Sequence, residues 1–186
     1  MNAPSIFQKT LFAAVAASAL LALPVHAANM TRPDYTAGKS RIGDVAKADK
    51  KACDSLSANA KDVCIQEAKA KEKVALAELE FGYTGTPKDQ TKVAVAKAES
   101  TYAVAKEKCD DQSGNAKDVC VKAAKAVEAR GLADAKMGKQ INEAKTDAAQ
   151  TKIDADYKLA AEKCESMTGD AKSSCMTTAK SRFGKS

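Results

Sequence analysis

Six cysteines fall into three pairs with one separation, and this regularity constrains the fold more than any other feature of the chain. The members of each pair lie eleven residues apart, and the pairs recur at nearly equal intervals, beginning at Cys53, Cys109 and Cys164. The segments between them agree, reading CDSLSANAKDVC, CDDQSGNAKDVC and CESMTGDAKSSC. A near-constant period of this kind is typical of repeat proteins. The chain is therefore expected to contain three copies of one unit.

Each unit is predicted to be helical. Alanine and lysine dominate the sequence around the cysteines, and both favour the α-helix. A heptad-like stripe of residues leads into the second and third pairs: Val95, Ala98, Tyr102, Ala105 and Cys109, then Ile153, Tyr157, Ala160 and Cys164. At helical spacing on such a stripe, the two tyrosines are interpreted as core residues and not as a ligand site.

The segment between paired cysteines predicts a tight turn between two helices. Asn59, Asn115 and Asp170 are favoured N-cap residues for the second helix of each hairpin. Just before them, Gly114 and Gly169 suit the left-handed conformation that commonly ends a helix. Antiparallel helices joined by a short turn bring the two cysteines face to face, at the Cα separation of ~5.5–6 Å that a disulfide requires.

Two states of the cysteines compete, a disulfide framework and a thiolate metal site. Pairs eleven residues apart lack the C-x-x-C spacing of zinc knuckles, and an even number of regularly spaced cysteines favours disulfides in an exported chain. We expect local bonds, and no metal or cofactor site. The predicted disulfide residues are Cys53 with Cys64, Cys109 with Cys120, and Cys164 with Cys175.

The predicted fold class is therefore all-α, with three disulfide-stapled antiparallel helical hairpins in tandem as a coiled-coil-like array. After a flexible lead at residues 28–40, the hairpins are assigned to residues 41–82, 87–138 and 139–183. Gly85, Thr86 and Pro87 separate the first two hairpins, and Asp89 completes a Thr-x-x-Asp box. The second junction has only Met137 and Gly138, so the sequence leaves open whether the helix runs through it.

The amino end reads as a secretory signal peptide, residues 1–27. Lys9 precedes a short apolar run, Leu11 to Leu23, that Pro24 closes, and small residues flank a cleavage site between Ala27 and Ala28. A membrane anchor is the alternative, but a spanning helix needs ~20 apolar residues and this run is shorter. No later segment is apolar enough to span a membrane. The expected location of the mature chain is the periplasm or the outside of the cell.

Removal of residues 1–27 leaves a chain without histidine or tryptophan, with a net charge of +5 in place of +6. Nucleophile pairs that use an imidazole base, and histidine-ligated metal or haem sites, are thereby excluded. Leu, Ile, Val and Phe together form only about 13% of the mature chain, below the ~20% typical of a packed domain. We expect no catalytic residues, no enzyme activity, and stability that depends on the disulfides.

The charge pattern indicates a solvated surface and weak binding to anionic partners. Lysines alternate with acidic residues in stretches such as residues 69–80 and 121–130, as on an exposed helix face. A modest positive charge permits binding to an envelope component such as lipid head groups or wall polymers. No aromatic platform accompanies the charge, so specific nucleic-acid binding is not expected.

The cysteine motif resembles that of small exported bacterial proteins of unknown function that carry one or more Ala/Lys-rich hairpins. The resemblance covers most of residues 45–182; similarity to the helical envelope protein of the Tol system is compositional only. It implies no catalytic or binding residues. Two functions stay open: a non-enzymatic binding or structural module of the cell envelope, and a stress protectant resembling late-embryogenesis helices.

Overall fold

The computed structural model describes residues 30–186, and these residues form only helices and turns. The predicted signal peptide and its cleavage site between Ala27 and Ala28 lie outside the described residues. The helices are α1 (Arg32–Ala52), α2 (Ala58–Thr84), α3 (Pro87–Cys109), α4 (Gly114–Glu165) and α5 (Gly169–Arg182), with a single 3₁₀ turn, η1 (Cys53–Ser55), after α1. The all-α prediction is confirmed. Among these helices, none combines the length and the apolar character that crossing a bilayer requires.

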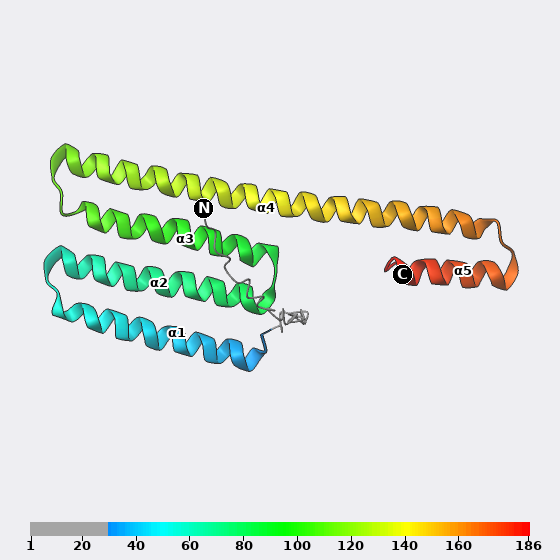
Figure 1. Ribbon diagram of the computed structural model, residues 1–186, viewed down its shortest axis with the longest axis horizontal. Coiled ribbons are helices and arrows are strands. Elements are labelled where there is room, and N and C mark those ends of the chain that lie inside the picture. The colour runs from blue at the N-terminus through cyan, green and yellow to red at the C-terminus, as the bar shows by residue number, and fades with distance from the viewer. Residues whose placement is uncertain (1–29) are drawn as a thin grey trace, which may run out of the picture.

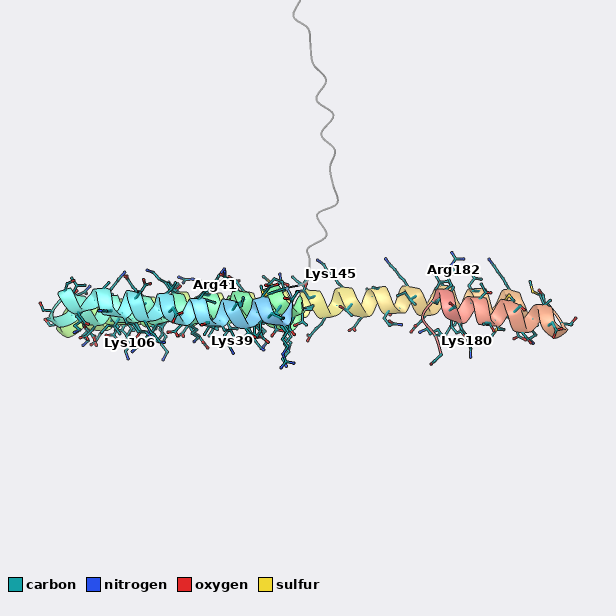
Figure 2. The ribbon with its side chains drawn as sticks, turned by 90° about the horizontal axis from the view of Figure 1, so that it is seen from below. Lys39, Arg41, Lys106, Lys145, Lys180 and Arg182 are labelled. Carbon is teal, nitrogen blue, oxygen red and sulfur yellow. A yellow bond between two sulfur atoms is a disulfide. The ribbon has the colours of Figure 1, made fainter. Side chains whose placement is uncertain are left out.

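The helices form a single layer. Helices α1, α2, α3 and the first half of α4 lie side by side, each antiparallel to the next (Figure 1). Figure 2 shows this layer edge-on, one helix thick, with basic side chains projecting from both of its faces. Helix α4 continues far beyond α3, and α5 folds back along its distal half on the same edge as α3 (Figure 1). Each helix therefore packs only on its neighbours in the layer.

The buried core of the described residues is built from small side chains. Its apolar members are alanines and the first cysteine of each pair: Ala46, Cys53, Ala68, Ala96, Cys109, Ala124, Ala135, Cys164 and Ala179. Small side chains let the helix axes approach closely. A Cβ atom added to Gly131 of α4 would lie 2.8 Å from the Cβ atom of Ala98 on α3. The small size of these buried side chains agrees with the low content of Leu, Ile, Val and Phe in the sequence.

Helix α1 begins earlier than the sequence predicts. Residues 28–40 are expected to be a flexible lead, but residues 32–40 are helical. Thr31 caps the helix, because its side chain accepts a hydrogen bond from the backbone N–H of Asp34 at 3.3 Å, and Pro33 lies in the first turn. The segment Thr31–Asp34 thus has the same capping box as Thr86 and Asp89, one unit earlier in the chain.

The two junctions between hairpins differ. Between α2 and α3, Gly85 adopts a left-handed conformation with φ of 63°, and Thr86 caps α3 as predicted. At the equivalent place in the second unit, α4 runs without a break through Gly138 for 52 residues. When Cys64 is aligned with Cys120, Ile141 takes the position of Gly85, and a β-branched side chain strongly disfavours the left-handed conformation. The units 87–138 and 139–183 therefore share one helix.

Candidate functional site

The six predicted disulfide residues pair locally in all three units, as the spacing predicted. The bonds join Cys53 to Cys64, Cys109 to Cys120, and Cys164 to Cys175, with Cα separations of 5.7, 5.7 and 5.6 Å. The first two lie at one end of the layer, at the α1–α2 and α3–α4 turns, and the third lies at the far end of α4 (Figure 1). The pairing is intramolecular, and none of the cysteines is free. The bonds fix the turns of the hairpins.

The same ion pair spans each of these turns. An acidic residue directly after the first cysteine contacts the lysine three residues before the second: Asp54 with Lys61 at 3.0 Å, Asp110 with Lys117 at 3.0 Å, and Glu165 with Lys172 at 2.6 Å. All six residues occupy fixed positions of the repeated motif, so the sequence carries a signal for these pairs. The pairs are solvent-exposed and orient the turn more than they stabilise it.

The N-cap prediction for these turns is wrong by two residues. Ser57, Ser113 and Thr168 precede the first helical residues, and their backbones are extended. The next residues, Ala58, Gly114 and Gly169, have positive φ. The sequence predicts this conformation for the two glycines at the end of the preceding helix, but each is the first residue of the following one. Asn59 therefore lies inside α2, where its side-chain Nδ2 donates to the backbone O of Glu107 on α3 at 3.1 Å. It links two hairpins instead of capping one helix.

A shallow groove lies between α2 and α3, and we call it the α2–α3 groove. Its volume is about 690 Å³. The apolar side chains of Ala70, Val74 and Ala75 line it from α2, and those of Val104 and Ala105 line it from α3. A groove of this shape lies open along the layer and offers an elongated apolar surface.

Ion pairs between the two helices border the groove. Glu67 contacts Lys108 at 2.7 Å, and Glu78 contacts Lys97 at 2.7 Å. Within the groove, the Oγ of Ser100 is buried and has no hydrogen-bond partner among residues 30–186. The groove is therefore an apolar surface with paired charges at its borders.

The titratable groups with a shifted pKa lie outside the α2–α3 groove. Hydrogen bonds from Lys92, Thr84 and Thr86 hold the pKa of Asp89 well below its usual range, against the opposing effect of burial. Asp89 in turn raises the pKa of Lys92. Near the other end of the chain, Lys185, together with Gln150, lowers the pKa of Asp154. Asp89 and Lys92 thus lie at the α2–α3 junction, and Asp154 links α4 to Lys185, which follows α5.

The predicted core tyrosines are half-buried. Tyr157 packs edge-on against Phe183 with ring centroids 6.4 Å apart, so it helps to hold the end of α5 against α4. Tyr102 is also half-buried, on α3. Across the part of the chain that the structure describes, the acidic and cysteine side chains form no cluster able to hold a metal ion.

Comparison with protein-family models, with curated proteins and with solved structures finds no match for this chain. The fold and the surfaces described above therefore carry the functional argument.

Proposed function

We propose that this chain is an exported, non-enzymatic helical repeat protein that serves as a binding or structural module of the cell envelope. The signal peptide predicted at residues 1–27 would direct it to the periplasm or out of the cell. Three intramolecular disulfides support this location, because such bonds persist in oxidising compartments.

The α2–α3 groove is the observation that carries the proposal. It combines an apolar surface lined by Val74 and Val104 with ion-paired borders, and the α1–α2 and α3–α4 disulfides fix the hairpins that form it. A groove held in shape before binding loses little conformational entropy when a partner is bound. The proposed partner is an envelope protein or an anionic envelope component, since the chain without residues 1–27 carries a net charge of +5.

The test is capture from envelope extract with the mature, oxidised protein and a groove variant, Val74→Glu with Val104→Glu. Charges in the apolar groove are expected to abolish capture of whatever the unchanged protein retains. The matched control is Val127→Glu on α4, outside the groove. The equivalent position of α2 is Lys71, so the fold accepts a charged side chain at this place in the repeat. Specific capture that both variants retain equally would contradict the groove as the binding site.

The alternative function is a stress protectant that resembles late-embryogenesis helices, and the Ala/Lys/Glu-rich composition favours it. Circular dichroism separates the two. A binding module is strongly helical in dilute buffer and changes little on drying, whereas a protectant of that type gains most of its helix on drying. Disulfide-fixed hairpins support the first outcome.

A further inference from the structure

Among the helices that the structure describes, none covers one edge of α4. Helix α3 covers the first half of α4 and α5 covers the second half, and both lie on the same edge (Figure 1). At 1.5 Å per residue, the 52 residues of α4 span about 78 Å. The opposite edge faces no other helix among residues 30–186, so a surface of this length is left without a partner.

The internal repeat relates each half of this edge to an earlier helix of the chain. The first half of α4 aligns with α2 when Cys64 is matched to Cys120, and the second half aligns with α3 when Cys109 is matched to Cys164. Helices α2 and α3 pack on each other within the chain. The free edge of α4 therefore carries an α2-type half followed by an α3-type half, and these two types are complementary.

Burial supports this correspondence. The α3-facing positions of α2 recur at helical spacing and are all half-buried: Asn59, Val63, Glu67, Ala70, Val74, Ala77 and Phe81. Their equivalents on α4 are all exposed: Asn115, Val119, Ala123, Ala126, Arg130, Ala133 and Met137. On α3, Ala96 and Ser100 are buried, whereas their equivalents Thr151 and Ala155 are exposed. The α4 positions lack the neighbour that covers the same positions on α2 and α3.

Together these positions form one continuous stripe, which we call the α4 edge. It comprises Asn115, Val119, Ala123, Ala126, Arg130, Ala133, Met137, Ile141, Ala144, Ala148, Thr151, Ala155, Leu159 and Glu162. The average spacing is about 3.6 residues, so the stripe stays on one side of a straight helix. Most of its members are apolar, and Val119, Met137 and Leu159 are more than half exposed, at 57, 54 and 58%.

The two halves of the α4 edge cannot meet within one chain, because an unbroken helix keeps them in line. We propose that they meet between two copies. The α4 helices of the two copies lie antiparallel, so that the first half of each α4 edge packs on the second half of the other. The arrangement has two-fold symmetry, with the axis passing near Ile141, and it reproduces the α2–α3 packing twice. Symmetric interfaces of this kind are the commonest in homodimers.

Charges on and beside the α4 edge suit this register. The Glu78–Lys97 pair of the α2–α3 interface corresponds to Asp134 of one copy and Lys152 of the other. One helical turn away, Arg130 falls opposite Asp156, at the positions of Val74 and Thr101. The other two ion pairs between α2 and α3 are replaced by an alanine opposite a charge, so no like charges meet at these positions. In each copy, α3 and α5 lie on the other edge of α4, so they do not block contact between the two α4 edges (Figure 1).

The experiment uses the mature, oxidised protein in sedimentation equilibrium across micromolar concentrations. The expected result is a monomer–dimer equilibrium, with twice the mass of one chain at the upper end. Asp134→Lys places lysine opposite Lys152 twice per dimer, and Lys152→Asp places aspartate opposite Asp134 twice. Each variant is expected to weaken dimerisation by about ten-fold or more, because like charges across an interface are strongly unfavourable.

Mixing the two variants gives the sharpest result. A dimer of one Asp134→Lys chain with one Lys152→Asp chain has both contacts complementary, so two weakly dimerising proteins should together restore the dimer. Lys125→Glu, at an exposed position away from the α4 edge, is the matched control and should dimerise as the unchanged protein does. A protein that stays monomeric, dimers indifferent to Asp134→Lys, or a mixture that fails to pair would each overturn the proposal. Far-UV circular dichroism confirms that every variant is folded.

Discussion

At the residue scale, the capping box of α3 links two hairpins through one carboxylate. The backbone N–H of Asp89 donates to Thr86 Oγ1 at 3.1 Å, and the hydroxyls of Thr84 and Thr86 both donate to Asp89 Oδ2, at 2.6 and 2.7 Å. Lys92 Nζ contacts the other carboxylate oxygen at 2.7 Å. Thr84 ends α2 and Thr86 precedes α3, so ionised Asp89 holds both sides of the junction.

This arrangement predicts a pH dependence of stability. Because the folded state holds the pKa of Asp89 below the ordinary aspartate value of ~3.9, its contribution is complete above that value and declines as the pH falls through it. Asp89→Asn should lower the melting temperature most at neutral pH, and the difference from the unchanged protein should shrink below about pH 4. Thermal melts at stepped pH measure this. Asp111→Asn, in the exposed α3–α4 turn, is the control and should show little difference at any pH.

Two helical glycines test how closely the helices pack. A Cβ atom at Gly43 would meet no atom within 4 Å, so Gly43→Ala should raise stability by about 0.5–1 kcal/mol through helix propensity. At Gly131 the same atom would lie 2.8 Å from the Cβ atom of Ala98, and Gly131→Ala should lower stability by about 1–3 kcal/mol. Chemical denaturation measures both. An equal gain in stability from both substitutions would contradict close packing of α3 on α4, because the added methyl group at Gly131 would then meet no resistance.

At this scale, some contacts could be predicted from the sequence and others could not. The pairing of the cysteines and the Thr86 box followed from spacing and known capping chemistry. The acidic residue and the lysine of the turn motif recur just as regularly, but a contact between them depends on the turn's geometry. Asn59 resembles a cap in sequence, and only the position of α3 shows that its side chain reaches Glu107 instead.

At the element scale, local residues decided where helices begin and whether they continue. The early start of α1 was predictable in principle from Thr31 and Asp34, because they repeat the box at Thr86 and Asp89. The box lies at the start of a unit, far from the cysteine motif in which the repeat is most regular. The continuity of α4 required a comparison of Gly85 with Ile141, because Gly138 by itself only weakens a helix.

The continuity of α4 predicts the effect of restoring the first junction at the second. The quadruple variant Ile141→Gly, Asn142→Thr, Glu143→Pro and Lys145→Asp copies Gly85, Thr86, Pro87 and Asp89. Proline in a helix interior is unfavourable by about 3 kcal/mol or more, and Gly permits the left-handed turn, so α4 should divide there. The third hairpin can then fold back onto the first half of α4 within one chain.

Small-angle X-ray scattering should record a shorter maximum dimension for this variant, and sedimentation should find a monomer because the α4 edge is now covered within the chain. The control variant, Ile141→Ala with Glu143→Ala, keeps strong helix formers and should retain the long helix. A quadruple variant with the unchanged protein's dimensions would show that more than these four positions keeps α4 straight.

At the scale of the whole molecule, the repeat predicted the hairpins but not their lateral order. Alanine-rich helices carry similar side chains on several faces, so periodicity identifies a helix without stating which face meets which neighbour. The free edge of α4 emerges only when exposed and half-buried equivalents are compared. A single layer also means that each helix depends on its neighbours alone, as in other repeat arrays.

This architecture predicts that the disulfides are a principal source of stability. The largest fully buried side chains among the described residues are Cys53, Cys109 and Cys164, and the rest of the apolar core is alanine. Because so little apolar area is buried, hydrophobic burial alone should leave the free energy of unfolding close to zero. Restricting the unfolded chain across each eleven-residue separation should contribute about 2–4 kcal/mol per bond.

Replacement of Cys109 and Cys120 by serine should therefore lower stability by about 2–4 kcal/mol. It should also loosen the packing of α3 against both α2 and α4, because the central hairpin borders both. The same replacement at Cys164 and Cys175 should leave α1 to α3 nearly unchanged, because among the described helices α5 contacts only α4. Hydrogen exchange resolves where each loss falls, and thermal melts with and without reductant measure the total. A reduced protein that melts within a degree or two of the oxidised one would contradict this account of what holds the layer together.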